Sequence, residues 1–149
     1  MKHALILGAA LCLSSALAQA QATPAGLWKT IDDASKKEKS LVRIADNGGV
    51  FSGRIEKLLD PPPDKPDPVC EKCTDERKDK PILGMVILSG VRKSDSASDL
   101  WDGGQILDTD NGKTYKVRLT PVEGGRKLEV RGYIGMPMLG RTQTWVRAD

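Results

Sequence analysis

Two short turn sequences, Asn111-Gly112 and Gly124-Gly125, constrain the fold more than any other feature of this chain. Each lies between runs that alternate between apolar and polar residues, and such dipeptides favour two-residue turns between antiparallel strands. The first turn predicts that Ile106 lies opposite Val117. The second predicts that Leu119 pairs with Val130. Both turns place the same side chains on one buried face of a three-stranded meander: Tyr115, Val117, Leu119, Val130 and Ile134.

A third glycine-rich turn joins two earlier runs of the same alternating kind. If Asn47-Gly48 is a two-residue turn, Ile44 pairs with Phe51, and Ile55 joins the same face. No stretch of the chain has a helical period. We expect eight strands, at residues 27–31, 41–44, 50–59, 82–88, 100–107 and 142–147 together with the two later strands of the meander.

Eight antiparallel strands joined mainly by short turns favour an all-β fold with a single small up-and-down β-barrel, and a β-sandwich is the alternative. A barrel of this size is either filled by its own side chains or holds one small ligand. Inward positions Gly53 and Gly132 leave room or mark bends in the strands. The residues expected to line a ligand cavity are Ile44, Phe51, Ile55, Tyr115, Val117 and Val130.

Residues 1–20 have the pattern of a secretory signal peptide. Lys2 and His3 precede an apolar run over residues 4–17, and Ala18-Gln19-Ala20 is a small-x-small cleavage site. We expect cleavage after Ala20, with Ala22 as the next choice. The apolar run is short for a membrane span. We therefore expect residues 21–149 to form one domain in the periplasm, without a transmembrane span.

Charge and composition argue against several classes of function. The net charge is +3, and basic residues alternate with acidic ones while aromatic residues make up 4%, so nucleic-acid binding is not expected. The single histidine leaves with the signal peptide, which removes a histidine base and the commonest zinc ligand. We expect no catalytic residue, no metal site, no cofactor and no enzymatic activity.

A proline-rich segment, residues 60–81, interrupts the strands and contains Cys70 and Cys73. Proline removes ladder hydrogen bonds, so the segment is expected to be either a flap over the barrel mouth or a mobile insertion. In an oxidising compartment the two cysteines predict a local structural disulfide. Neighbouring acids such as Asp75 would raise a thiol pKa rather than lower it, which argues against a redox site.

Gly26-x-Trp28 resembles the G-x-W motif of the lipocalin family, whose eight-stranded barrels hold small apolar ligands. In that family an arginine of the last strand packs across this tryptophan at the closed end. The resemblance implies that Arg147, or else Arg141, closes the barrel with Trp28. Such a cation over a ring contributes about 0.5–2 kcal/mol. The opposite end of the barrel would then be the mouth.

A further set of motifs covers nearly all of the chain after the signal peptide. It comprises Gly26-Leu27-Trp28, Gly53-Arg54-Ile55, Cys70-x-x-Cys73, Pro81-Ile82-Leu83-Gly84, Trp101-Asp102-Gly103-Gly104, Asn111-Gly112-Lys113-x-Tyr115, Arg131-Gly132-Tyr133-Ile134-Gly135 and Leu139-Gly140-Arg141-Thr142-Gln143-x-Trp145. Together these motifs resemble the bacterial exported family catalogued as domain of unknown function 2147. The resemblance implies an envelope location and a lipocalin-like barrel, and it carries no established reaction or ligand.

We therefore expect a periplasmic, non-catalytic binding protein for a small hydrophobic or amphipathic molecule. One alternative is an envelope protein–protein interaction module with a filled barrel, which would recognise its partner through the Cys70–Cys73 loop and Met136-Pro137-Met138. Another alternative is a thiol redox or metal-handling protein that acts through Cys70 and Cys73.

Overall fold

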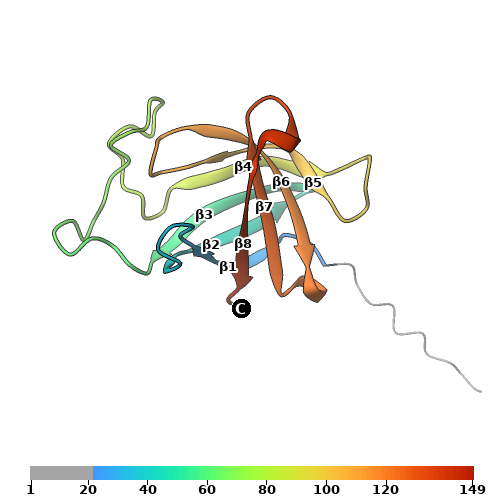
Figure 1. Ribbon diagram of the computed structural model, residues 1–149, viewed down its shortest axis with the longest axis horizontal. Helices are drawn as coiled ribbons and strands as arrows, with labels where there is room; N and C mark the ends of the chain where they lie inside the picture. Colours follow the sequence, from blue (N-terminus) through green and yellow to red (C-terminus); the bar gives the residue numbers. More distant parts are fainter. Residues whose placement is uncertain (1–21) are drawn as a thin grey trace, which may run out of the picture.

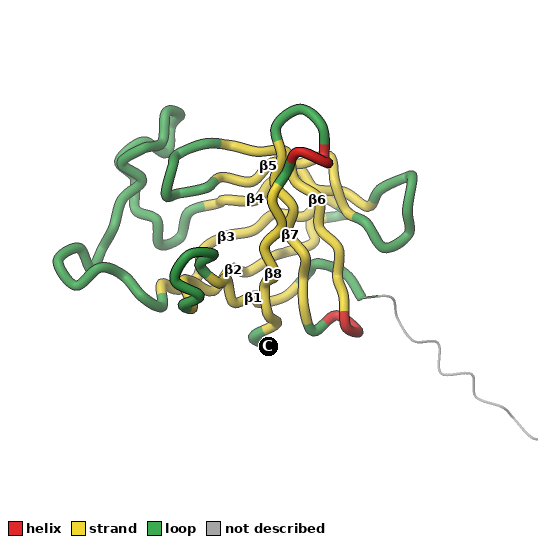
Figure 2. Tube along the Cα trace, in the orientation of Figure 1, coloured by secondary structure: helices red, strands yellow, loops and turns green. Residues whose placement is uncertain are grey.

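A closed β-barrel of eight antiparallel strands makes up the computed structural model, which describes residues 22–149 (Figures 1 and 2). The predicted signal peptide, residues 1–20, lies outside the described residues. Each strand pairs with its neighbours in the chain, and β1 pairs with β8 to close the barrel. The strands are β1 (Gly26–Ile31), β2 (Glu38–Asn47), β3 (Val50–Leu58), β4 (Val86–Lys93), β5 (Trp101–Leu107), β6 (Thr114–Val122), β7 (Lys127–Tyr133) and β8 (Arg141–Arg147).

The predicted all-β, up-and-down barrel is confirmed, and the sandwich alternative is wrong. Within residues 22–149 the helical segments are two 3-10 turns, η1 (Glu123–Gly125) and η2 (Pro137–Leu139). Because the strands alternate in direction, the connections gather in two groups at the two ends of the barrel. One group comprises the β1–β2, β3–β4, β5–β6 and β7–β8 connections.

The end opposite these four connections is filled by large side chains. The Phe51 ring meets the Trp101 ring edge to face, with centroids 6.3 Å apart. Trp28, Val117 and their neighbours are buried here, and burial of each such side chain contributes about 1.5–3 kcal/mol. We call this end the closed end and the other the open end.

The register of β6 with β7 is as predicted, since Leu119 pairs with Val130. The predicted register of β5 with β6 is wrong, because Ile106 pairs with Tyr115 and not with Val117. A two-residue turn at Asn111-Gly112 needs positive φ at both residues. Gly112 has a φ of 73°, whereas Asn111 is not among the residues with positive φ, and the turn is therefore wider.

The predicted register of β2 with β3 is also wrong. Ile44 pairs with Gly53 and not with Phe51. The turn is centred on Gly48-Gly49, which have φ of 65° and 90°, instead of on Asn47-Gly48. Glycine adopts positive φ at both positions without steric cost, so the chain turns one residue later than predicted.

Two further expectations about the strands are corrected. The fourth strand begins at Val86, since Ile82 to Met85 form a turn that is closed by the hydrogen bond from Met85 N–H to Ile82 O (3.1 Å). Ile134 lies just beyond the end of β7 and is exposed, so it is not part of the buried face.

Candidate ligand-binding cavity

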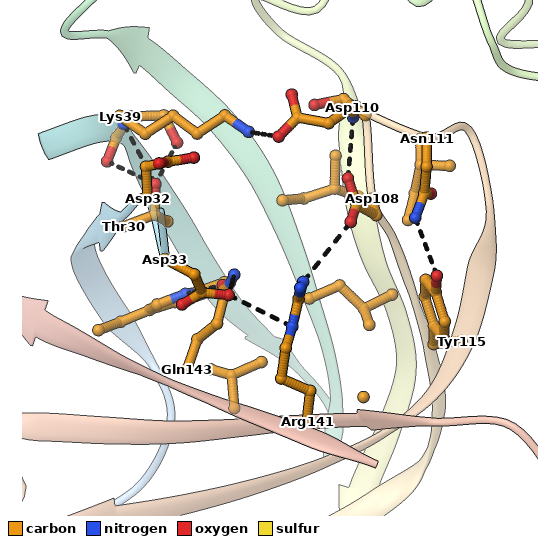
Figure 3. Close-up of a pocket in the computed structure, with 18 of the residues that line it drawn as sticks. Thr30, Asp32, Asp33, Lys39, Asp108, Asp110, Asn111, Tyr115, Arg141 and Gln143 are labelled. Carbon is orange, nitrogen blue, oxygen red and sulfur yellow. Dashed lines mark hydrogen bonds and ion pairs between the residues drawn. The ribbon is translucent and has the colours of Figure 1, made fainter. Parts of the chain in front are cut away.

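A cavity of about 630 Å³ opens at the open end of the barrel (Figure 3). Pockets for small molecules typically have volumes of about 300–1,000 Å³. Apolar side chains of five strands contribute to its lining, and these include Ile55, Leu58, Ile87, Ile106, Leu107, Val130 and Trp145. The barrel is therefore filled at one end and hollow at the other.

The six residues predicted to line a cavity divide between these two ends. Ile55, Tyr115 and Val130 line the cavity. Ile44, Phe51 and Val117 are buried in the packed closed end and are not among the lining residues, so this part of the prediction is wrong. The hairpin pattern identifies the face on which a side chain lies. It does not give its depth along the barrel axis.

Trp145 and Gln143 were missed as cavity residues. Both are inward positions of β8, and the indole Nε1–H of Trp145 donates a hydrogen bond to Gln143 Oε1 (3.2 Å). The alternation Gln143-Thr144-Trp145 places them on one face. That alternation is the signal that would have identified them.

Small or hydroxylated residues make room in the wall of the cavity. Gly132 is an inward residue of β7, and a Cβ at this position would lie 3.5 Å from the Cβ of Tyr115, which is an ordinary contact. On the other side, the hydroxyls of Thr30 and Ser40 are hydrogen-bonded to each other at 2.8 Å. These two buried hydroxyls are therefore satisfied within the wall.

A chain of polar side chains leads from the mouth into the cavity. Arg141 Nε lies 3.3 Å from Asp33 Oδ2, and Arg141 Nη2 lies 3.8 Å from Asp108 Oδ2. The amide of Gln143 donates to the same oxygen of Asp33 (3.0 Å). Figure 3 shows Arg141 between the two aspartates. Arg141 therefore lies at the mouth, and the suggestion that it closes the barrel is wrong.

A second ion pair, between Lys39 of β2 and Asp110 of the β5–β6 connection, crosses the mouth on another side. Asn111 of the same connection donates its amide N–H to the hydroxyl of Tyr115 (2.9 Å). In the β1–β2 connection, the backbone hydrogen bond from Ser35 is the largest cause that lowers the pKa of Asp32. The rim of the cavity is thus charged, while its walls combine apolar side chains with a few polar groups, among them Thr30, Ser40 and Gln143.

The closed end carries the contact predicted between Trp28 and Arg147. The guanidinium carbon of Arg147 lies 4.3 Å from the centroid of the Trp28 ring. Arg147 Nε also donates to Gly125 O (2.6 Å), and Nη1 donates to Ala25 O (3.1 Å). A Cβ on Gly26 would lie 2.2 Å from Arg147 Nη1. Gly26 also has a φ of 136°, a backbone conformation that favours glycine, so the glycine of the G-x-W motif suits both the backbone and the nearby arginine.

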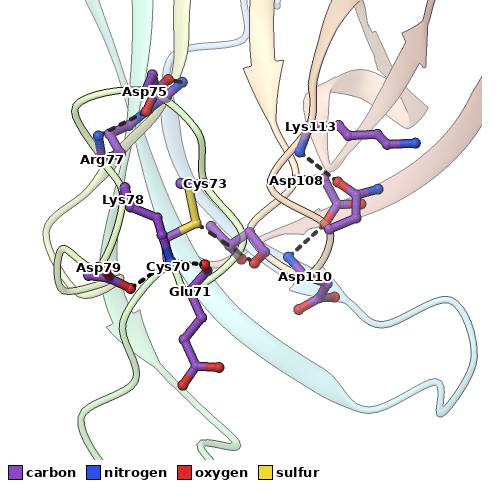
Figure 4. The surroundings of a disulfide bond; sticks show 12 residues. Cys70, Glu71, Cys73, Asp75, Arg77, Lys78, Asp79, Asp108, Asp110 and Lys113 are labelled. Carbon is purple, nitrogen blue, oxygen red and sulfur yellow. Dashed lines mark hydrogen bonds and ion pairs between the residues drawn. A yellow bond between two sulfur atoms is a disulfide. The ribbon is translucent and has the colours of Figure 1, made fainter.

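The proline-rich segment packs beside the mouth. Cys70 and Cys73 form the predicted disulfide, and both residues are buried (Figure 4). The Sγ of Cys70 lies 3.9 Å from the carbonyl of Thr109. A Cβ on Gly112 would lie 1.8 Å from the carbonyl oxygen of Lys72. The disulfide loop is therefore in contact with the β5–β6 connection that carries Asp108 and Asp110.

Among residues 22–149, no group of three or more His, Cys, Asp or Glu side chains is placed to hold a metal ion. In the same residues, no helix has the length and hydropathy needed to cross a membrane.

A closed eight-stranded barrel, hollow at one end and sealed at the other by an arginine over a tryptophan, defines a lipocalin-like protein. Residues 26–147 match the family described as "Uncharacterized protein conserved in bacteria (DUF2147)", and the chain belongs to this family. A search of curated proteins found no match.

A solved structure agrees with this fold. Its title is "Protein HP1028 from the human pathogen Helicobacter pylori belongs to the lipocalin family". The two proteins are 23% identical, with a TM-score of 0.72, and the match covers 86% of this chain and 84% of that chain. This likeness supports the lipocalin-like fold.

Proposed function

We propose that the protein binds one small molecule with an apolar body and a polar end, and that it catalyses no reaction on it. The observation that carries the proposal is the cavity of about 630 Å³, whose walls contain apolar side chains and whose rim is charged. Transfer of an apolar body from water into such a cavity is favourable in proportion to the area that is buried.

The positions of the polar groups support an amphipathic ligand. Val130, Ile87 and Trp145 offer apolar contact inside the cavity, whereas Asp33, Arg141 and other charged groups stand at the rim. A wholly apolar ligand would leave its outer end beside these charges. A molecule with a polar end keeps that end at the rim, where hydrogen-bonding groups and water are available.

We propose that binding takes place in the periplasm. The signal-peptide pattern of residues 1–20 supports export, and a buried disulfide fits an oxidising compartment. The direct check is fractionation of a bacterium that expresses the full chain. The protein should be found in the periplasmic fraction with Met1 to Ala20 removed, and an intact N-terminus would contradict the proposal.

Thiol chemistry has less support than binding, because Cys70 and Cys73 are bonded to each other and buried. An interaction role is favoured by one observation, the exposed apolar side chains of the β7–β8 connection. That role does not need a filled barrel, so it is compatible with ligand binding.

Trp145 provides a direct test, since its indole lines the cavity while Trp28 and Trp101 lie at the closed end. An amphipathic fluorophore such as 1-anilinonaphthalene-8-sulfonate should bind the wild type and accept excitation energy from tryptophan. Substitution Trp145→Phe should reduce the energy transfer more than Trp101→Phe, the matched control, because the Trp145 indole lines the cavity.

A second variant tests occupancy of the cavity itself. Gly132→Val places two methyl groups inside the cavity, where a small added side chain is tolerated. It should weaken probe binding at least about tenfold, which corresponds to roughly 1.4 kcal/mol. Thr144→Val, on the exposed face of the adjacent β8, should have little effect. Equal binding by Gly132→Val and the wild type, or no probe binding by the folded wild type, would refute the proposal.

A further inference from the structure

The connection between β7 and β8 exposes an unusual group of apolar side chains. Ile134, Met136, Met138 and Leu139 are 64%, 56%, 71% and 75% exposed. Residues 134–140, which we call the apolar loop, contain no charged residue. Large apolar side chains that gather on one surface usually mark a site of interaction.

The apolar loop is an ordered structure. Arg131 Nε donates to the carbonyl of Pro137 (2.7 Å), and its Nη2 donates to the carbonyl of Met138 (3.3 Å). The 3-10 turn η2 spans Pro137–Leu139. In Figure 1 the loop, drawn in dark red, projects from one edge of the barrel. The apolar side chains are therefore held outward by the fold.

Basic residues occupy the outer face of the barrel directly beside this loop. Arg118 of β6 is paired with Arg131 of β7, and Lys116 is paired with Tyr133 at the start of the loop. The nearest acidic residue on the outer face of β7 is Glu129, which lies farther toward the closed end. We call Lys116, Arg118 and Arg131 the basic patch.

Neighbouring cations on paired strands repel one another unless an anion lies close to them. Across residues 22–149, none of the described ion pairs includes Lys116, Arg118 or Arg131. By contrast, Lys39 and Arg141 at the rim of the cavity are paired with aspartates. The basic patch therefore has the charge that would complement an external anionic surface.

We propose that the apolar loop and the basic patch together form a docking surface for an anionic lipid bilayer. Apolar side chains of interfacial segments enter the boundary between headgroups and acyl chains, while basic side chains beside them attract anionic headgroups. The apolar loop would enter the boundary between headgroups and acyl chains, and the basic patch would contact the headgroups. Ile134 and Leu139 also line the cavity, so docking would bring the mouth to the bilayer surface.

The first test uses the mature protein and vesicles that float in a density gradient. The protein should float with vesicles of equal parts phosphatidylglycerol and phosphatidylcholine. Its affinity for vesicles of phosphatidylcholine alone should be at least about tenfold lower, because the basic residues would find no anionic headgroups there. Binding should weaken as salt is raised, since salt screens the attraction between exposed charges.

Two pairs of variants separate the roles of the loop and the patch. The double substitution Met136→Ser and Met138→Ser should reduce binding to the anionic vesicles at least about tenfold. Two apolar side chains would then no longer be transferred from water into the bilayer. Leu83→Ser is the matched control, since Leu83 is 53% exposed but lies in the β3–β4 connection. Lys116→Glu should reduce binding about fivefold or more. Lys57→Glu, on β3 across the barrel, should not.

Each contrary outcome overturns the proposal. Equal binding to neutral and anionic vesicles would show that the basic patch is not used. If the Met136→Ser/Met138→Ser variant binds anionic vesicles as well as the wild type does, the protein adsorbs by charge alone. No vesicle binding, together with a dimer in analytical ultracentrifugation that the same variant dissociates, would assign the apolar loop to contact with a second copy of the chain. None of these results depends on a ligand in the cavity.

Discussion

Arg147 should be the residue whose side chain contributes most to sealing the closed end of the barrel. Its guanidinium stacks on Trp28 and donates to the carbonyls of Gly125 and Ala25. It thereby joins the start of β1, the β6–β7 turn and the end of β8. Substitution Arg147→Met removes the charge and all the donors but keeps much of the side-chain volume.

The expected loss follows from these contacts. A hydrogen bond from a charged donor contributes about 1.5–3 kcal/mol, and a cation over a ring contributes about 0.5–2 kcal/mol. The Arg147 side chain is 26% exposed, so water partly screens these interactions and replaces some of the lost hydrogen bonds. We expect Arg147→Met to lower the free energy of unfolding by about 2–4 kcal/mol.

Arg141 provides the matched control because it is the other arginine that the sequence suggests for barrel closure. Its side chain is 67% exposed and makes ion pairs with Asp33 and Asp108 at the mouth. Exposed ion pairs contribute about 0–1 kcal/mol, so Arg141→Met should have a small effect. Urea unfolding followed by circular dichroism measures both variants. A loss for Arg141→Met equal to or above that for Arg147→Met would refute the reasoning.

Three other results are expected. Val117→Ala should lower the free energy of unfolding by about 1–3 kcal/mol, since Val117 is fully buried; a loss within about 0.5 kcal/mol in urea unfolding would contradict this packing. Double replacement of Cys70 and Cys73 by Ser should cost less than about 2 kcal/mol, because the closed ring is short. It should speed hydrogen exchange mainly in residues 60–81 and 108–113, and retained zinc or a reactive low-pKa thiol in the wild type would argue against a structural disulfide. Burial raises the pKa of Asp149, but hydrogen bonds from the Leu27 N–H and from Arg147 outweigh this, and the pKa is lowered from 3.8. The stability that Asp149 contributes is therefore present above pH 3.8 and lost as the pH falls below it, and urea midpoints measured against pH should show a smaller acid loss for Asp149→Asn.

The sequence predicted which side chains face inward better than it predicted which residues pair. Two of the turns are displaced, so Ile106 and Ile44 each lie opposite a residue two places from the expected one. A shift of two leaves every side chain on its face, because side chains of a strand alternate with a period of two. For this reason Val117, Leu119 and Val130 are buried on one face, as predicted, although the register of β5 with β6 differs.

The candidate site was only partly predictable from the sequence. Tyr115 and Val130 line the cavity as expected, whereas Phe51 packs on Trp101 at the closed end. Depth along the barrel axis depends on strand tilt and stagger, which are set when the barrel closes. The rim also forms only when the barrel closes, because Asp33 and Gln143, which are hydrogen-bonded there, are 110 residues apart in the sequence. No local pattern encodes such a contact.

The distribution of side-chain size along the barrel explains why one end is hollow. Trp28, Phe51 and Trp101 fill the closed end, while Gly132 and Ser40 stand among the inward residues near the mouth. Stability and binding should therefore respond to different substitutions. Arg147→Met should weaken the fold while the cavity lining is unchanged, and Gly132→Val should weaken binding while the closed end stays packed. A loss of probe affinity without a loss of stability in the second variant would show that the open end serves binding and the closed end serves the fold.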